Sequence, residues 1–152
     1  MRSVPLFAVI LIAAGCAQKG PSPAALTDAA AACQGLATAV SYWSCANREE
    51  KALYLEQDSP DLDVINLWHA YRLALARQLD SGALSRERHD LVYAEAEAEV
   101  AAELEARYDA RRLNRAPSQP SLAALIDSFT AFNYAYGTSI TCQQSGVVTT
   151  CF

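Results

Sequence analysis

The chain has 152 residues, of which 12 are basic, 17 are acidic and 52% are hydrophobic. This length is enough for one domain with a modest core. The net charge of −5 argues against nucleic-acid binding, because neutralising phosphates requires a clustered basic surface.

The first segment has the layout of a secretory signal. Arg2 is its only charge, and residues 4–14 are apolar or small apart from Pro5. A transmembrane helix needs about 20 apolar residues, so this run is too short to remain as a membrane span. A buried core helix is the alternative, but Gly20 and Pro21 would end it at once. We therefore expect the chain to be exported.

The apolar run ends in "AAGC". This ending resembles the lipobox of bacterial lipoproteins, with Ala13 where the family usually has leucine. The resemblance implies that 1–15 are a signal peptide and that Cys16 becomes an acylated N-terminus, carrying chains such as palmitate that anchor it stably to the membrane. Ala17 stands where an aspartate would favour retention, which in lipoproteins of the enterobacterial type implies the outer membrane, facing the periplasm. A soluble secreted protein cut near this point is the alternative.

Residues 16–32 are rich in Ala, Pro and Ser and predict a flexible tether with transient helicity. One domain is expected over 33–152, mainly α, with about four helices and a short disulfide-closed β-hairpin at 138–152. The helices are recognised by capping residues at their starts and by Gly or Pro at their ends. They are expected at 38–57, 60–80, 86–114 and 121–136.

The capping residues are serines and a threonine. They are Thr38, Ser59, Ser85 and Ser121. In the second helix, Pro60 occupies the first position and the apolar residues recur every three or four positions. This stripe consists of Val64, Trp68, Tyr71, Leu75 and Leu79. Gly82 would close the helix in a left-handed conformation. The centre of the third helix is rich in alanine, so a neighbouring helix can approach closely.

The connection "LDSGALSRE" between the second and third helices resembles the turn of the short helical hairpins called SHOCT domains. The resemblance is limited to this hairpin. It implies antiparallel helices joined by a tight turn and no particular function.

Four cysteines remain after Cys16. They are Cys33, Cys45, Cys142 and Cys151. An even number in an oxidising compartment predicts two disulfides. A zinc site is the alternative, but there is no C-x2-C pair, and His69 and His89 lie far from the cysteines in sequence. We expect neither a metal nor a cofactor.

The tail "TSITCQQSGVVTTCF" is rich in strand-forming residues. A two-residue loop at 146–147 would place glycine where a type II′ turn needs it. Cys142 then faces Cys151 in a non-hydrogen-bonded pair, where Cα atoms lie about 4.5 Å apart and a disulfide fits. A turn one residue earlier would place Cys142 opposite Thr149, so the disulfide selects the register.

Cys33 and Cys45 are then left for each other. In one continuous helix they would lie about 18 Å apart, too far for a disulfide. The chain must therefore fold back between them, and 34–35 ("QG") can provide the turn. Free thiols or a different pairing are the alternatives.

The C-x3-G-x4-C spacing of the tail resembles the ends of small exported proteins and lipoproteins of proteobacteria. Those proteins also combine an N-terminal two-cysteine segment with a long polar helix. The resemblance implies a location in the cell envelope and no particular activity.

Few residues suggest chemistry. His69 is expected to be structural or at the surface, and His89 to be solvated. Five acids of the third helix predict a solvated face in preference to a cation site, because residues two apart on a helix diverge. They are Glu95, Glu97, Glu99, Glu103 and Glu105. Four arginines near the helix end are explained by the helix dipole, with phosphate or headgroup contact as the alternative. They are Arg107, Arg111, Arg112 and Arg115.

No hydrolase, P-loop or dinucleotide-binding motif is present, and no enzyme activity is expected. The sequence thus predicts a lipid-anchored envelope protein that acts by contact with an envelope partner or as an assembly accessory. The alternative is a periplasmic module that binds a small ligand or cation beneath Trp43, Trp68 and the aromatics of 129–136. A cell-wall or polysaccharide hydrolase is the least supported interpretation.

Overall fold

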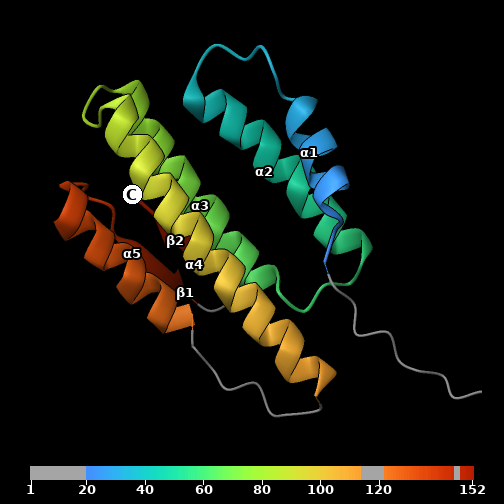
Figure 1. Ribbon diagram of the computed structural model, residues 1–152. Coiled ribbons are helices and arrows are strands. Elements are labelled where there is room, and N and C mark those ends of the chain that lie inside the picture. Colours follow the sequence, from blue (N-terminus) through green and yellow to red (C-terminus); the bar gives the residue numbers. More distant parts are fainter. Residues whose placement is uncertain (1–19, 114–121, 146–147) are drawn as a thin grey trace, which may run out of the picture.

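The computed structural model describes residues 20–113, 122–145 and 148–152. These ranges form helices followed by a two-stranded hairpin, as Figure 1 shows. The elements are α1 (Pro23–Ala31), α2 (Ala39–Glu56), α3 (Leu62–Asp80), α4 (Arg86–Arg112), α5 (Leu122–Tyr136), β1 (Cys142–Ser145) and β2 (Val148–Cys151). The predicted fold class, mainly α with a terminal hairpin, is confirmed. Five helices form within the described ranges, where about four were expected.

Helix α3 occupies the centre. It contacts α2, α4 and β2, while α1 packs on α2 and α5 packs on α4 (Figure 1). Because neighbours surround α3, burial extends beyond the predicted stripe to residues on its other faces. The buried apolar residues of α3 are Val64, Ile65, Leu67, Trp68, Tyr71, Ala74, Leu75 and Ala76. The central position of α3 lets it contribute residues to contacts with both α2 and α4.

The core beside α3 is built from α4 and α5. Val92 and Ala96 of α4 are fully buried, and the ring of Phe129 of α5 stacks on Tyr71 with centroids 4.1 Å apart. Phe129 is therefore a core residue. Burying such large rings removes a large apolar area from water and stabilises this side of the domain.

The N-terminus of α2 is capped from two directions. Thr38 Oγ1 accepts a hydrogen bond from the Ser41 backbone nitrogen at 3.1 Å. The carboxylate of Asp80, at the end of α3, accepts from the backbone nitrogens of Ala39 and Val40, each at 2.9 Å. These two hydrogen bonds hold the pKa of Asp80 below its ordinary value. The predicted Thr38 cap is confirmed, and Asp80 adds a contact between helices.

The start of α3 differs from the prediction. The helix begins at Leu62, and Ser59 does not cap it; the Ser59 hydroxyl instead accepts from the Asp61 backbone nitrogen at 3.3 Å within the loop. Asp61 occupies the capping position without a side-chain hydrogen bond to the helix. Its carboxylate is bound by Arg111, so a tertiary ion pair replaces the local cap.

Helix α1 forms inside the segment 16–32 that was expected to be a tether. Ser22 caps it by accepting from the Ala25 nitrogen at 3.2 Å, and Pro23 occupies the first helical position. Ser followed by Pro is a standard helix start. Alanine-rich composition suggested a linker, but packing against α2 stabilises the helix.

Both disulfides are present. Cys33 bonds to Cys45 with Cα atoms 5.8 Å apart, and Gly35, at φ 84°, provides the fold-back between them. Gly82 has φ 75° and ends α3 as predicted, and Ser85 caps α4 by accepting from the Arg88 nitrogen. The first disulfide joins the end of α1 to α2.

The hairpin has the predicted register. Cys142 pairs with Cys151, with Cα atoms 4.1 Å apart, and Ser145 pairs with Val148. The expected turn at 146–147 lies outside the described residues. Arg77 of α3 donates to the backbone oxygen of Cys151 at 3.4 Å, so β2 is attached to the central helix.

Candidate functional site

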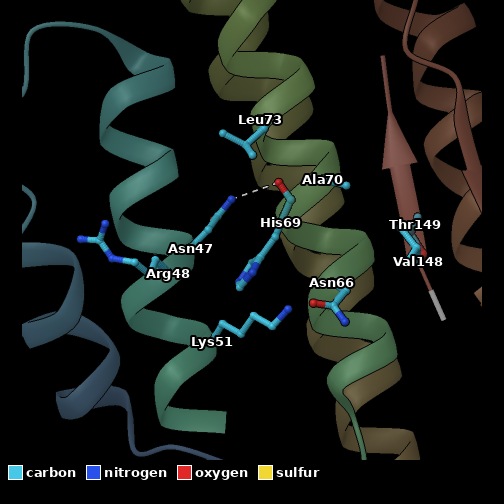
Figure 2. A pocket seen from close by; sticks show the side chains of 9 residues that line it. All are labelled: Asn47, Arg48, Lys51, Asn66, His69, Ala70, Leu73, Val148 and Thr149. Carbon is cyan, nitrogen blue, oxygen red and sulfur yellow. Dashed lines mark hydrogen bonds between the residues drawn. The ribbon is translucent and has the colours of Figure 1, made fainter. Parts of the chain in front are cut away.

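A buried polar cluster lies between α2 and α3. Asn47 and Glu50 lie three residues apart on α2, and His69 and Arg72 lie three apart on α3, so each pair shares a helix face. Arg72 donates to Asn47 and to the carboxylate of Glu50, whose Oε2 lies 3.2 Å from His69 Nε2. Asn47 Nδ2 donates to the backbone oxygen of His69 at 3.1 Å (Figure 2). We call these four residues the α2–α3 cluster.

Burial and charge compete in setting the titration of this cluster. Burial alone would raise the pKa of Glu50, but its contacts with His69 and Arg72 outweigh that effect and hold the pKa below its ordinary value. Burial lowers the pKa of His69 despite the opposing contact with Glu50. At neutral pH, Glu50 is therefore ionised and His69 is neutral. An ionised carboxylate cannot protonate a leaving group, so Glu50 does not suit the general-acid role that a glycosidase requires.

Aromatic rings enclose the guanidinium of Arg72. It lies 4.7 Å from the centroid of Trp43 and 5.0 Å from that of Trp68. The ring of Tyr93, from α4, lies 5.2 Å from each tryptophan ring, and burial raises the pKa of Tyr93 to about 12. These rings border a cavity of about 370 Å³, which α1 and the carboxylates of Glu50 and Glu97 also line. We call it the aromatic cavity.

A second cavity of about 460 Å³, the outer cavity, lies between α2, α3 and β2. Figure 2 shows Lys51 extending toward Asn66 beside the ring of His69. Arg48 points away from them and pairs with Glu49 at 2.9 Å. Among the described residues that line this cavity, none is acidic. His69 thus lines the outer cavity and also belongs to the buried α2–α3 cluster.

The arginines near the end of α4 form ion pairs between helices. Arg107 donates to Asp63 at 2.8 Å and to Glu103 at 2.6 Å. Arg111 binds both carboxylate oxygens of Asp61 at 2.8 Å each. The predicted explanation, interaction with the helix dipole, is therefore incomplete, because these two side chains join α4 to the start of α3. We call these five residues the α3–α4 ladder.

The other two arginines differ. Arg112 is largely exposed and lies 3.7 Å from Asp109, while Arg115 lies outside the described residues. The ladder leaves neither Arg107 nor Arg111 free to bind a phosphate without breaking an ion pair.

Two sequence-based expectations about α4 are wrong. His89 was expected in solvent, but it is only 7% exposed, with its Nδ1 2.9 Å from Asp90 and its ring stacked on Tyr93. Glu103 was assigned to a solvated acidic face, but it is buried against Arg107. Both residues lie on the buried face of α4, because His89 and Glu103 continue the three- and four-residue spacing of Val92, Ala96 and Val100.

The other predicted site residues do not all lie in one place. Trp43 and Trp68 meet at the aromatic cavity as proposed for ligand binding, whereas Phe129 packs in the core and does not reach it. The four paired cysteines are all committed to disulfides, and Cys16 lies outside the described residues. Over the described ranges, no three His, Cys, Asp or Glu side chains gather as a metal site would need.

The α2–α3 cluster was not predicted from the sequence. Asn47 and Glu50, spaced N-x-x-E, fall on the inner face of α2, and His69 and Arg72, spaced H-x-x-R, interrupt the buried surface of α3. The sequence signal that could have revealed the cluster is a pair of polar residues three positions apart on an otherwise apolar helix face. The four residues meet only because α2 packs against α3, and the sequence of either helix alone does not show that packing.

None of the helices in the described ranges is long and apolar enough to cross a membrane. Comparison of the chain with models of protein families, with curated proteins and with solved structures found no match in any of the three.

Proposed function

We propose that this chain is a lipid-anchored protein of the cell envelope, attached through Cys16 to the periplasmic face of the outer membrane, and that it acts by contact with another envelope protein. The observation that carries the envelope location is the pair of disulfides, because such bonds persist in oxidising compartments. The lipobox-like ending before Cys16 supports the anchor.

Contact with a partner is supported by the outward side of α4. Leu91, Ala94, Ala98 and Ala101 are exposed and follow one another at spacings of three and four residues, so they form one stripe. Small side chains at such spacing let a second helix approach closely. We call these residues the α4 stripe.

Site-specific photocrosslinking in cells tests the contact. A photoreactive residue at Ala98 should capture one defined envelope protein, whereas the same residue at Ala131, an exposed alanine of α5, should not. Equal capture at both positions, or none at Ala98, would contradict a contact through the α4 stripe.

Intact mass spectrometry of the membrane-extracted protein tests the anchor. Cleavage before Cys16, acylation and two disulfides should appear together, and reduction should add the mass of four hydrogens. An unprocessed chain with free thiols would contradict the proposed location.

A second candidate function is the binding of a small organic cation, which the aromatic cavity favours. Aromatic faces attract cations, and Arg72 already shows this attraction toward Trp43 and Trp68. Glu97 adds a carboxylate to the lining. The cavity volume of about 370 Å³ is within the range of small-molecule sites.

Tryptophan fluorescence titration with choline tests this candidate. Binding should change the emission of Trp43 and weaken in Glu97→Gln, which removes the charge but keeps the shape. Glu105→Gln, on the same helix but outside the cavity lining, is the matched control. An unchanged spectrum at millimolar choline would exclude quaternary ammonium ligands.

A further inference from the structure

The described part of the chain begins with a segment that is fixed to one end of the bundle. Pro21 is buried, and Gly20 lies so close to Tyr54 that an added Cβ would come within 3.1 Å of the tyrosine ring. Tyr54 is in the last turn of α2, and Gly20 and Tyr54 also line a cavity with Tyr108 of α4. The entry point of the domain is therefore a defined place, close to the ends of α2 and α4.

The distance from this entry point to the proposed anchor is short. Gly20 follows Cys16 by four residues, which span at most about 14 Å even when fully extended. The sequence predicted a flexible tether over 16–32, which would let the domain move away from the membrane. Because α1 takes up 23–31 and Gly20 is already packed, little tether remains.

The end of the bundle near Gly20 carries two exposed leucines. Leu55 lies next to the last residue of α2 and is 51% exposed, and Leu113 caps α4 and is 48% exposed. In Figure 1, the start of α1 and the ends of α2 and α4 lie at the same end of the molecule. Leu91 is exposed near the other end of α4, roughly 33 Å away along the helix.

We propose that this end, with Leu55 and Leu113 at its edge, rests on the phospholipid surface to which Cys16 is anchored. The inference rests on the proposed acylation of Cys16. The short connection holds the domain at the surface, and the two leucines supply apolar area that can enter the headgroup region. The exposed residues at this end include two acids, Glu56 and Asp58, and one base, Arg112. Because these charges do not form a basic surface, the proposed contact does not depend on attraction to anionic lipid. The contact should therefore persist in zwitterionic vesicles and at high salt.

The orientation predicts which side of the molecule faces its partners. With the ends of α2 and α4 at the membrane, α4 extends away from the bilayer over about 40 Å. Leu91 and the rest of the α4 stripe are then presented to the periplasm.

Photolabelling from the lipid tests the inference on the full acylated protein. Phosphatidylcholine vesicles containing a phosphatidylcholine with a photoreactive group near its headgroup are irradiated, and adducts are mapped by mass spectrometry. We expect adducts in the peptides that contain Leu55 and Leu113. The double variant Leu55→Ser with Leu113→Ser should lower the adduct yield about threefold, while Leu91→Ser should leave it unchanged.

A longer connection provides a second test. Inserting about 12 Gly and Ser residues before Gly20, with an r.m.s. span of roughly 20 Å, should abolish most adducts without altering the fold. Adducts concentrated on Leu36 or on Leu91 in the acylated protein would overturn this orientation alone, and so would a complete lack of adducts. An unacylated protein, identified from its intact mass, would overturn both the orientation and the proposed anchor.

Discussion

Two polar networks hold α3, one on each side, and they differ in their surroundings. The α2–α3 cluster is deeply buried, with Arg72 5% exposed and flanked by tryptophan rings. The α3–α4 ladder lies at the edge of the bundle, with Arg111 partly exposed and bound to Asp61 through two parallel hydrogen bonds. The same residue types thus operate in two different dielectric environments.

The two networks also differ in how completely their charged groups are hydrogen-bonded. In the ladder, Arg107 and Arg111 are partly exposed, and each guanidinium meets its carboxylates at ordinary hydrogen-bond distances, although Asp61 and Glu103 are themselves buried. In the cluster, Arg72 Nε has no hydrogen-bond partner among the described residues. Taking charges out of water costs more than imperfect pairing returns. The cluster shares Glu50 and Arg72 with the lining of the aromatic cavity, whereas the ladder is explained by the packing of α4 on the start of α3.

Removing the charge at the centre of the cluster should have the largest effect. Arg72→Met keeps an apolar side chain between Trp43 and Trp68 but leaves Glu50 and Asn47 without their donor. Breaking a buried ion pair on one side only costs about 3–5 kcal/mol. Denaturant unfolding followed by circular dichroism should show this loss in the free energy of unfolding.

The double variant Glu50→Leu with Arg72→Met is the control. It removes both charges, so it should recover a large part of the stability lost in the single variant. If Arg72→Met alone costs less than about 1 kcal/mol, the cluster is better solvated than its burial indicates.

An intermediate effect is expected in the ladder. Arg111→Ala leaves the buried carboxylate of Asp61 without its two donors, and losing hydrogen bonds to a charged group costs about 2 kcal/mol. Arg112→Ala, on the same turn of the helix, is the matched control. Arg112 is 61% exposed and weakly paired, so this change should stay within about 0.5 kcal/mol. Equal costs for the two variants would mean that the ladder does not stabilise the domain.

The fold was predicted where the determinants are local. Thr38 and Ser85 cap their helices, and Gly82 ends α3, because capping depends on residues within one turn. The hairpin register followed from the requirement that Cys142 face Cys151. By contrast, Asp61 gives up its capping role for Arg111, which lies on another helix. Such competition with a tertiary contact has no local signature.

The candidate site was predicted less well for the same reason. Trp43 and Trp68 were expected to line a cavity, but the burial of His89 depends on where α4 crosses the bundle. Predicting that α1 packs against α2 would likewise have needed two signals combined: the Cys33–Cys45 disulfide and the helix start at Ser22 and Pro23. Sequence patterns indicate which face of a helix is apolar, and leave open which other helix covers it.

The smallest effect concerns pH and should separate the two networks. The pKa of His69 is lowered from 6.5 by burial, so below pH 6.5 the unfolded chain gains a proton that the folded chain does not take up. Stability therefore falls as the pH decreases from 6.5, and below 4.5 the lowered pKa of Glu50 adds a further loss of the same sign. Thermal unfolding at several pH values should show that His69→Gln removes the loss between pH 6.5 and 4.5 and weakens the loss below 4.5, because the contact with His69 helps to hold the pKa of Glu50 down. Because His69 belongs to the cluster and Arg111 does not, Arg111→Ala should leave the loss between pH 6.5 and 4.5 unchanged.

A stability profile that is flat between pH 6.5 and 4.5 in the unmodified protein would contradict this account. It would mean that water reaches His69 from the outer cavity and that the cluster is not a dry interior.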